Sequence, residues 1–207
     1  VDDGVPRLVC AGSPYKYFPE HDHLFVDIAR RLGRCQFLFF TDIATHLSRQ
    51  LEARLTIAFR EGGLDAARHV RFLPRQSRPA FFGLMQRCDV YLDTVGFSGF
   101  NTAMQAVECG LPVVTIEGRF MRGRLAAGIL RRMELPELVA GNADQYIETV
   151  VRLCQDSVYR RDVVERIVAQ RHILFRDPAP VQALEAFLVR PKQNARGCCH
   201  GRPLDTQ

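Results

Sequence analysis

Short apolar runs alternate with amphipathic segments along this chain, and this alternation is the feature that most constrains its fold. Five largely apolar runs of strand length occur at positions 7–11, 35–40, 70–73, 89–93 and 113–116. Between them apolar residues recur at helical spacing, as Leu24, Ile28 and Leu32 do. Apolar strands separated by helices form parallel sheets that are covered on both faces. We therefore predict an α/β fold with a doubly wound, Rossmann-like parallel sheet and C-terminal helices.

The size and composition of the chain fit one globular domain. Its 207 residues are 47% apolar, and no apolar run approaches the roughly 18 residues of a membrane-spanning helix. We expect a single domain over residues 1–189. Residues 190–207 are polar and basic and show no periodicity, which predicts a disordered basic tail.

Basic residues outnumber acidic ones by 28 to 23, but their distribution does not predict a nucleic-acid partner. The tail holds four basic residues and one acidic residue, whereas residues 1–189 hold 24 basic and 22 acidic side chains. The predicted domain therefore carries no large excess of positive or negative charge. A nucleic-acid-binding protein that depends on the basic tail is an alternative, and it requires steeply salt-dependent binding.

The cysteines do not indicate a disulfide framework. Five occur singly in apolar segments, where a thiol packs as a small apolar group: Cys10, Cys35, Cys88, Cys109 and Cys154. Cys198, Cys199 and His200 cluster in the tail, where soft-metal binding is an alternative. We predict no metal site elsewhere and a reducing, cytoplasmic location. Because the chain begins at Val1 without a signal peptide, we expect it to be part of a longer protein.

Ligands of open parallel sheets bind beyond the carboxyl ends of the strands, so the loops at that edge are candidate sites. Lys16 is the only lysine of the predicted domain and lies in the loop after the first strand. A compact positive charge at this position suits a phosphate group. A solvated surface lysine is an equal alternative.

The loop after the third strand carries a cation and an aromatic ring three residues apart. Arg78 and Phe81 stand at the start of a helix that Ser77 can cap, so both can face one side. A phosphate partner and a stacking ring are groups that a nucleotide needs. The alternative is that Phe81 or its neighbour Phe82 belongs to the apolar core.

A third loop, residues 96–102, contains glycine and leads into a helix predicted to begin at Asn101. The first turn of such a helix exposes backbone N–H groups, to which Asn101 and Thr102 add side-chain donors. The sequence matches neither the dinucleotide-binding nor the P-loop fingerprint. Asp93, at the carboxyl end of the fourth strand, can also line a site, whereas Asp89 is expected at the opposite end.

The segment that contains this loop, residues 89–133, resembles the catalytic half of the O-linked N-acetylglucosamine transferase family, particularly its bacterial SPINDLY-like members. It reads DVYLDTVGFSGFNTAMQAVECGLPVVTIEGRFMRGRLAAGILRRM. The resemblance extends over most of residues 7–170. It implies a family 41 GT-B glycosyltransferase with two Rossmann-like domains, the C-terminal one holding a UDP-sugar donor. It also implies that an N-terminal acceptor domain and tetratricopeptide repeats precede this chain in the full-length protein.

The resemblance implies roles for residues in the first two loops. Tyr15 and Lys16 match the family's Tyr-Lys pair, in which the lysine contacts the donor diphosphate and serves catalysis. Arg78 falls where the family has a basic residue near the nucleotide. Phe81 falls where it has an aromatic residue or histidine that stacks on uracil.

The third loop matches the family's diphosphate-binding loop, with Gly99, Phe100, Asn101 and Thr102 at the matching positions. Phe100 replaces the glycine or histidine of other members. Gln105, one turn on, falls where many members have an acidic residue for the ribose hydroxyls. This departure bears on ribose affinity, although glutamine can still hydrogen-bond.

The implied reaction is inverting transfer of a sugar such as N-acetylglucosamine to a protein Ser or Thr hydroxyl, with a UDP-sugar donor, no cofactor and no bound metal. Lys16, helix N–H groups and hydroxyl donors stabilise the leaving diphosphate. The acceptor-activating base is not identified in this chain, because acceptor groups in the family come largely from the N-terminal domain. We expect the chain alone to be inactive. A non-catalytic nucleotide-binding module is an alternative, motivated by Gln105.

Overall fold

The computed structural model describes residues 4–43, 45–175 and 177–197. Its strands are β1 (Arg7–Cys10), β2 (Gln36–Phe40), β3 (Val70–Leu73), β4 (Val90–Leu92), β5 (Val113–Ile116) and β6 (Val139–Ala140). All neighbouring pairs are parallel, in the order β3-β2-β1-β4-β5-β6. This order confirms the predicted Rossmann-like sheet, in which the direction of winding reverses between β1 and β4.

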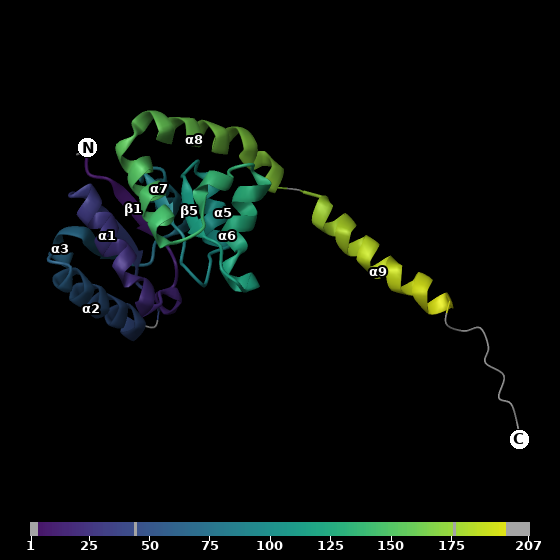
Figure 1. Cartoon of the computed structure of the whole chain (residues 1–207), viewed down its shortest axis with the longest axis horizontal. Coiled ribbons are helices and arrows are strands. Elements are labelled where there is room, and N and C mark those ends of the chain that lie inside the picture. The colour runs from purple at the N-terminus through teal and green to yellow at the C-terminus, as the bar shows by residue number, and fades with distance from the viewer. Residues whose placement is uncertain (1–3, 44, 176, 198–207) are drawn as a thin grey trace, which may run out of the picture. The chain divides into compact units, whose positions relative to one another are not determined.

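Helices cover both faces of the sheet. The first six are α1 (Asp22–Leu32), α2 (Thr45–Glu61), α3 (Ala66–His69), α4 (Arg78–Met85), α5 (Asn101–Glu108) and α6 (Leu125–Arg132). They are followed by α7 (Ala143–Gln155) and α8 (Ser157–Gln170), while α9 (Ala179–Gly197) belongs to a separate unit. Figure 1 shows β1 and β5 between a layer that contains α1 and α7 and a layer that contains α5 and α6. The strands are therefore buried on both faces, which explains why they read as apolar runs.

Several helices begin at side-chain caps, among them the cap that the sequence predicts at Ser77. The Asn142 side chain accepts the Gln145 N–H at 2.9 Å, and the Asp156 side chain accepts the Tyr159 N–H at 2.9 Å. Ser77 accepts the Ala80 N–H at 3.4 Å at the start of α4. Each cap satisfies an N–H group that the first turn of a helix leaves without a partner.

Aromatic rings fill the core between α1, α2 and the strands β2 and β3. Phe25 on α1 meets Phe37 and Phe39 on β2 with ring centroids 5.3 Å apart in each pair, and Phe39 stacks on Phe72 at 5.2 Å. Phe37 and Phe39 are no more than 1% exposed. Burial of such a ring contributes about 1.5–3 kcal/mol. This cluster packs α1 against β2 and joins β2 to β3.

The sequence places a helix face over Met121, Leu125, Ile129 and Met133, but α6 begins only at Leu125. Residues Met121–Gly123 form the 3-10 turn η3, and Met121 is exposed. Gly118 and Gly123 pack backbone to backbone here, and the Gly118 N–H donates to the Gly123 carbonyl at 2.8 Å. This close contact bends the chain and delays the start of the helix.

The chain divides into two compact units, residues up to His172 and residues from Ile173 onward. The second contains α9, whose first N–H, on Ala179, donates to the Asp177 carboxylate at 3.0 Å. The predicted domain ended at residue 189 and the predicted tail began at 190, whereas α9 continues to Gly197. Residues 198–207, with Cys198, Cys199 and His200, lie outside the described residues. Within the described part, no helix has both the length and the apolar character needed to cross a bilayer.

Candidate functional site

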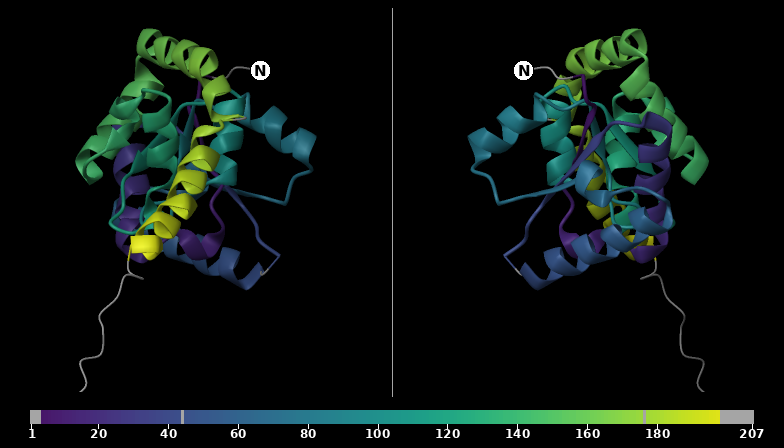
Figure 2. Two further views of the ribbon diagram at one scale, coloured as in Figure 1. Left: turned by 90° about the vertical axis from the view of Figure 1, so that its right-hand side faces the viewer. Right: turned by 90° about the vertical axis from the view of Figure 1, so that its left-hand side faces the viewer.

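A cavity of about 540 Å³ opens at the carboxyl edge of the sheet. We call it the carboxyl-edge cavity; it is lined by residues 11–14 after β1, residues 40–43 at the end of β2, Arg75 and Gln76 after β3, Phe81 on α4, and Thr102 and Gln105 on α5. Figure 2 shows the loops after β2 and β3 diverging from the sheet toward α2 and α4. The cavity thus lies where the strand order reverses, which is the ligand-binding position of this fold.

The structure brings together three of the residues that the sequence singles out, Phe81, Thr102 and Gln105, around this cavity. Phe81 is half-buried, and its ring packs edge-on against Phe40 with centroids 5.2 Å apart. This contact with Phe40 helps to fix the Phe81 ring, which can offer its surface to a planar group. Gln105 lies one turn after Thr102 on α5, so both side chains face the same cavity.

Arg78 does not line the carboxyl-edge cavity. It is exposed at the first position of α4, with its guanidinium 5.4 Å from the centre of the Phe82 ring. Arg75, three residues earlier in the extended loop, lines the cavity instead. The sequence pattern singles out Arg78 in this loop and not Arg75. The structure therefore offers a second cation for a bound anion.

Tyr15 and Lys16 do not line the carboxyl-edge cavity; Lys16 ends the 3-10 turn η1 (Pro14–Lys16), two residues after the lining residue Pro14. The Lys16 N–H donates to the Ser13 carbonyl at 2.9 Å, which fixes this turn. The ammonium lies 4.5 Å from the centre of the Phe97 ring, and Tyr15 meets the same ring edge-on at 6.0 Å. Burial lowers the pKa of Lys16, and the nearby Asp93 charge opposes this shift. Lys16 thus joins the first loop to the loop of residues 94–100, which leads into α5.

Gly99 is required for steric reasons within the 94–100 loop. A Cβ at Gly99 would lie 2.7 Å from the Thr102 hydroxyl oxygen and 3.0 Å from that of Tyr91. The Gly99 N–H donates to the Asp93 carboxylate at 2.8 Å, so this amide is already used within the protein. Gly99 therefore shapes the loop, and its N–H is not the donor that a ligand would meet.

The helix α5 begins at Asn101 and points its first turn toward the carboxyl-edge cavity. The N–H groups of a first turn have no partner within the helix and carry the positive end of its dipole. Asn101 is exposed, as is Phe100, half of whose surface is accessible. The Thr102 hydroxyl lies 2.7 Å from the Tyr91 hydroxyl, which anchors it to β4. Together these groups can receive an anion.

Asp93 lies beneath this loop and is only 3% exposed. Burial raises the pKa of its carboxyl group, while hydrogen bonds from Ser98 and Thr115 act in the opposite direction. The sequence suggests that Asp93 can line a site, because it lies at the carboxyl end of the fourth strand. The structure shows that its carboxylate is turned inward and bonded to the loop.

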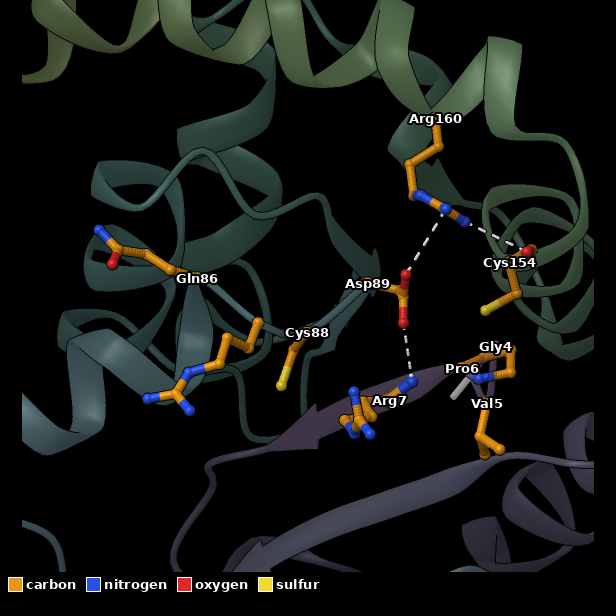
Figure 3. Close-up of a pocket in the computed structure, with 10 residues that line it drawn as sticks. Gly4, Val5, Pro6, Arg7, Gln86, Cys88, Asp89, Cys154 and Arg160 are labelled. Carbon is orange, nitrogen blue, oxygen red and sulfur yellow. Dashed lines mark hydrogen bonds and ion pairs between the residues drawn. The ribbon is translucent and has the colours of Figure 1, made fainter. Parts of the chain in front are cut away.

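A second cavity, of about 470 Å³, lies at the amino ends of β1 and β4 (Figure 3). There Asp89 accepts the Arg7 N–H at 2.8 Å and lies 3.6 Å from the Arg160 guanidinium, which confirms its predicted place opposite Asp93. Cys88 and Cys154 also line this cavity, and burial raises the pKa of each thiol to about 12. Protonated thiols are poor nucleophiles. This cavity is at the wrong edge of the sheet for the ligand site of the fold.

Titratable side chains do not gather into a metal site in the described ranges: no group of three or more histidine, cysteine, aspartate or glutamate residues is placed to hold an ion there. Cys10, Cys35, Cys88, Cys109 and Cys154 are free thiols, as the sequence predicts.

Comparison with known proteins identifies relatives of this arrangement. The model of glycosyl transferase family 41 matches residues 16–176. A solved structure of a Thermobaculum terrenum O-GlcNAc transferase mutant superposes with a TM-score of 0.79 and 28% identity, covering 91% of this chain and 36% of that one. The Actinobacillus pleuropneumoniae (serotype 5b) UDP-glucose:protein N-beta-glucosyltransferase is 27% identical over 124 residues, which are 56% of this chain and 20% of that protein.

A plant relative is similar over a shorter region. The probable UDP-N-acetylglucosamine–peptide N-acetylglucosaminyltransferase SPINDLY of Solanum lycopersicum is 32% identical over 68 residues, or 33% of this chain and 7% of that protein. The chain thus spans a minor part of the length of each of these relatives.

Proposed function

The chain belongs to glycosyl transferase family 41, and we propose that it is the donor-binding half of a UDP-sugar-dependent glycosyltransferase. One observation carries this proposal above the others. In a chain of this family, the cavity at the carboxyl edge of the sheet joins an aromatic ring, Phe81, to the first turn of a helix with Thr102 at its start. A nucleoside diphosphate needs both a stacking surface and an anion-binding helix start.

The proposed donor lies with its base at α4 and its diphosphate at α5. Phe81 stacks on uracil, and Gln105 hydrogen-bonds the ribose hydroxyls. Asn101, Thr102 and the first-turn N–H groups of α5 bind the phosphates, with Gly99 and Phe100 shaping the loop. We assign the cationic contact near the nucleotide to Arg75 in addition to Arg78, because Arg75 lines the cavity.

Lys16, positioned by its neighbour Tyr15, neutralises the diphosphate as it leaves. The Lys16 ammonium lies next to the ring of Phe97, which belongs to the loop that leads into α5. The positive charge therefore lies close to the loop before this helix. A preorganised positive charge of this kind stabilises negative charge that develops in a transition state. We propose that Lys16 and the start of α5 together serve the leaving group without a bound metal or cofactor.

The proposed reaction is inverting transfer to a protein Ser or Thr hydroxyl. The acceptor oxygen attacks the anomeric carbon of the sugar from the face opposite UDP. A new carbon–oxygen bond forms there as the bond to the β-phosphate oxygen breaks, and the hydroxyl proton passes to a base. We place that base, the acceptor site and the tetratricopeptide repeats in an N-terminal part of the full-length protein, and the protein in the cytoplasm.

A ligand titration tests the donor assignment. We expect the full-length protein to bind UDP and either UDP-N-acetylglucosamine or UDP-glucose more tightly than GDP. The reason is that we assign the part of the carboxyl-edge cavity beside Phe81 to uracil, a pyrimidine, and not to the larger guanine ring. The two sugars are compared because relatives carry names that specify each of them. Equal binding of GDP and UDP would contradict the assignment of a uracil site.

The alternative, a non-catalytic nucleotide-binding module, is favoured by one residue, Gln105, which lines the carboxyl-edge cavity at the position where many members of the family have an acidic residue. Sugar transfer or UDP-sugar hydrolysis by the full-length protein separates the two functions. Transfer that is lost in Lys16→Ala supports the enzyme. UDP binding without turnover on any donor supports the module.

A further inference from the structure

We infer that Asp93 is a positioning residue for the diphosphate, because its buried carboxylate holds the 94–100 loop in the shape from which α5 presents its first turn. The inference rests on the proposed function, which supplies the diphosphate. It concerns a side chain that does not itself reach the ligand.

The carboxylate of Asp93 binds donors from two different segments. One oxygen, Oδ1, accepts the Gly99 N–H at 2.8 Å. The other, Oδ2, accepts the Ser98 hydroxyl at 2.6 Å and the Thr115 hydroxyl at 2.7 Å. Ser98 and Gly99 belong to the loop, whereas Thr115 lies on β5. The loop is thereby tied through Asp93 to two neighbouring strands of the sheet.

Ser98 extends this network beyond the carboxylate. Its hydroxyl oxygen accepts the Ala126 N–H at 2.9 Å while its proton is donated to Asp93. The Ser98 N–H donates to the Arg122 carbonyl at 2.8 Å. Ser98 is 1% exposed, so all these bonds are shielded from water. The loop after β4 is therefore fastened to the start of α6 as well as to the sheet.

The Gly99 bond determines what α5 offers to a ligand. With its N–H turned down to Asp93, the Gly99 backbone packs against the Thr102 hydroxyl and the Tyr91 hydroxyl. The helix then begins at Asn101, and its first-turn N–H groups are the donors left at the cavity. Without the carboxylate, the Gly99 N–H and two hydroxyl groups lose their acceptor, and the loop loses the hydrogen bonds that hold it in this shape.

An uncharged amide alters this network, although Asp93→Asn has nearly the same shape. An NH₂ group in the place of Oδ2 donates and accepts nothing, so the Ser98 and Thr115 hydroxyls must accept from it and turn their own protons elsewhere. The remaining acceptors are distant, the Gly99 carbonyl at 3.4 Å from Ser98 Oγ and the Ile116 carbonyl at 3.5 Å from Thr115 Oγ1, so the bonds to a charged group are lost. The Asp93 charge also opposes the loss of the Lys16 proton, so both positive elements of the site depend on it.

The test compares UDP with uridine, because only UDP reaches the phosphate-binding loop. We expect Asp93→Asn in the full-length protein to weaken UDP binding by at least about tenfold, as the loss of more than one hydrogen bond to a charged group implies. Uridine binding, measured by displacement, should change by less than about twofold, because Phe81 and the base pocket do not depend on Asp93. Asp144→Asn, the same change at an exposed position on α7, should leave both affinities unchanged.

Ser98→Ala provides a second variant, since it keeps the carboxylate and the Gly99 bond while removing one donor. It should weaken UDP binding by less than Asp93→Asn and again spare uridine. UDP binding by Asp93→Asn at the wild-type affinity, or an equal loss for UDP and uridine in both variants, would overturn the positioning role. A wild-type protein that binds neither UDP nor uridine would instead overturn the proposed function itself.

Discussion

The Tyr91 hydroxyl lies 2.7 Å from the Thr102 hydroxyl, and this contact joins the middle of the sheet to the first turn of α5. Tyr91 is fully buried on β4, where burial raises the pKa of its phenol. Thr102 lines the carboxyl-edge cavity. The orientation of a side chain that lines the cavity is therefore set by a core residue that does not line it.

Removal of this contact should weaken both folding and binding. We expect Tyr91→Phe to lower the free energy of unfolding by about 1 kcal/mol, the usual contribution of a buried hydrogen bond. The Thr102 hydroxyl becomes free to rotate, so UDP binding should weaken by a few fold. Urea denaturation and calorimetric titration measure the two effects. Tyr159→Phe on α8, away from the cavity, should leave UDP affinity unchanged, and an equal loss there would contradict the assignment.

A methyl group at Gly99 should disturb the site directly. Gly99→Ala places a Cβ 2.7 Å from the Thr102 hydroxyl oxygen, so the loop or the threonine must move. We expect UDP affinity to fall by about tenfold or more, equivalent to roughly 1.4 kcal/mol. Gly128→Ala is the matched control, because a Cβ at this position on α6 meets nothing within 4 Å. It should stabilise the helix by about 0.5–1 kcal/mol and leave UDP binding intact.

Binding of UDP should depend on the protonation of Lys16. Burial lowers the pKa of this lysine from its usual 10.5, so the ammonium is lost at a lower pH than in an exposed lysine. UDP affinity should therefore be full near neutral pH and fall as the pH rises through the Lys16 pKa. Lys16→Arg should retain affinity over this range, since arginine keeps its proton. Lys16→Ala should bind about tenfold to a hundredfold more weakly at neutral pH and show no such decline.

The pH dependence of UDP binding can contradict the role of Lys16. If wild type and Lys16→Ala show the same pH profile for UDP, the lysine does not contact the diphosphate.

Glu117 makes acid stability depend on two arginines. It follows β5 and pairs with Arg131 and, at 2.7 Å, with Arg124, and these bonds lower its pKa from 4.5 to about 2. A carboxyl group whose pKa is depressed by folding stabilises the protein above its unfolded pKa and loses that effect as the pH falls through its folded pKa. The stability advantage of wild type over Glu117→Gln should therefore be full above pH 4.5 and vanish near pH 2. Urea midpoints across this range measure it, with the exposed Glu148→Gln as the control.

The strands of this fold were largely predictable, and the short or bent elements were not. The structure has β3 and β5 at the predicted bounds, because a buried parallel strand is a continuous apolar run between polar turns. The helix α3 (Ala66–His69) has four residues, too few to leave a helical period in the sequence. The start of α6 depends on the contact of Gly118 with Gly123, which only the folded chain reveals.

Part of the lining of the carboxyl-edge cavity could be predicted from the sequence, whereas the bonding beneath it could not. Phe81, Thr102 and Gln105 meet because the carboxyl ends of parallel strands share one edge, which follows from topology alone. That Arg75 and not Arg78 lines the cavity depends on the path of the loop after β3. The hydrogen bonds to the Asp93 carboxylate could not be foreseen, because they come from Gly99 in the following loop and from Thr115 on another strand, which only the folded chain brings together.

The two aspartates that flank β4 have a consequence for the fidelity of folding. The strand itself has only three residues, Val90–Leu92, and an aspartate stands on each side of it. Asp89 is bonded to the backbone of β1 at Arg7, and Asp93 to the side chain of Thr115 on β5. Each end of the strand is thus aligned against a different neighbour, and a slip of one residue would break both alignments at once. A misregistered sheet would leave the buried carboxylate of Asp93 without its Thr115 donor and the partly exposed one of Asp89 without its bond to β1, so the same bonds that shape the site disfavour errors in strand pairing.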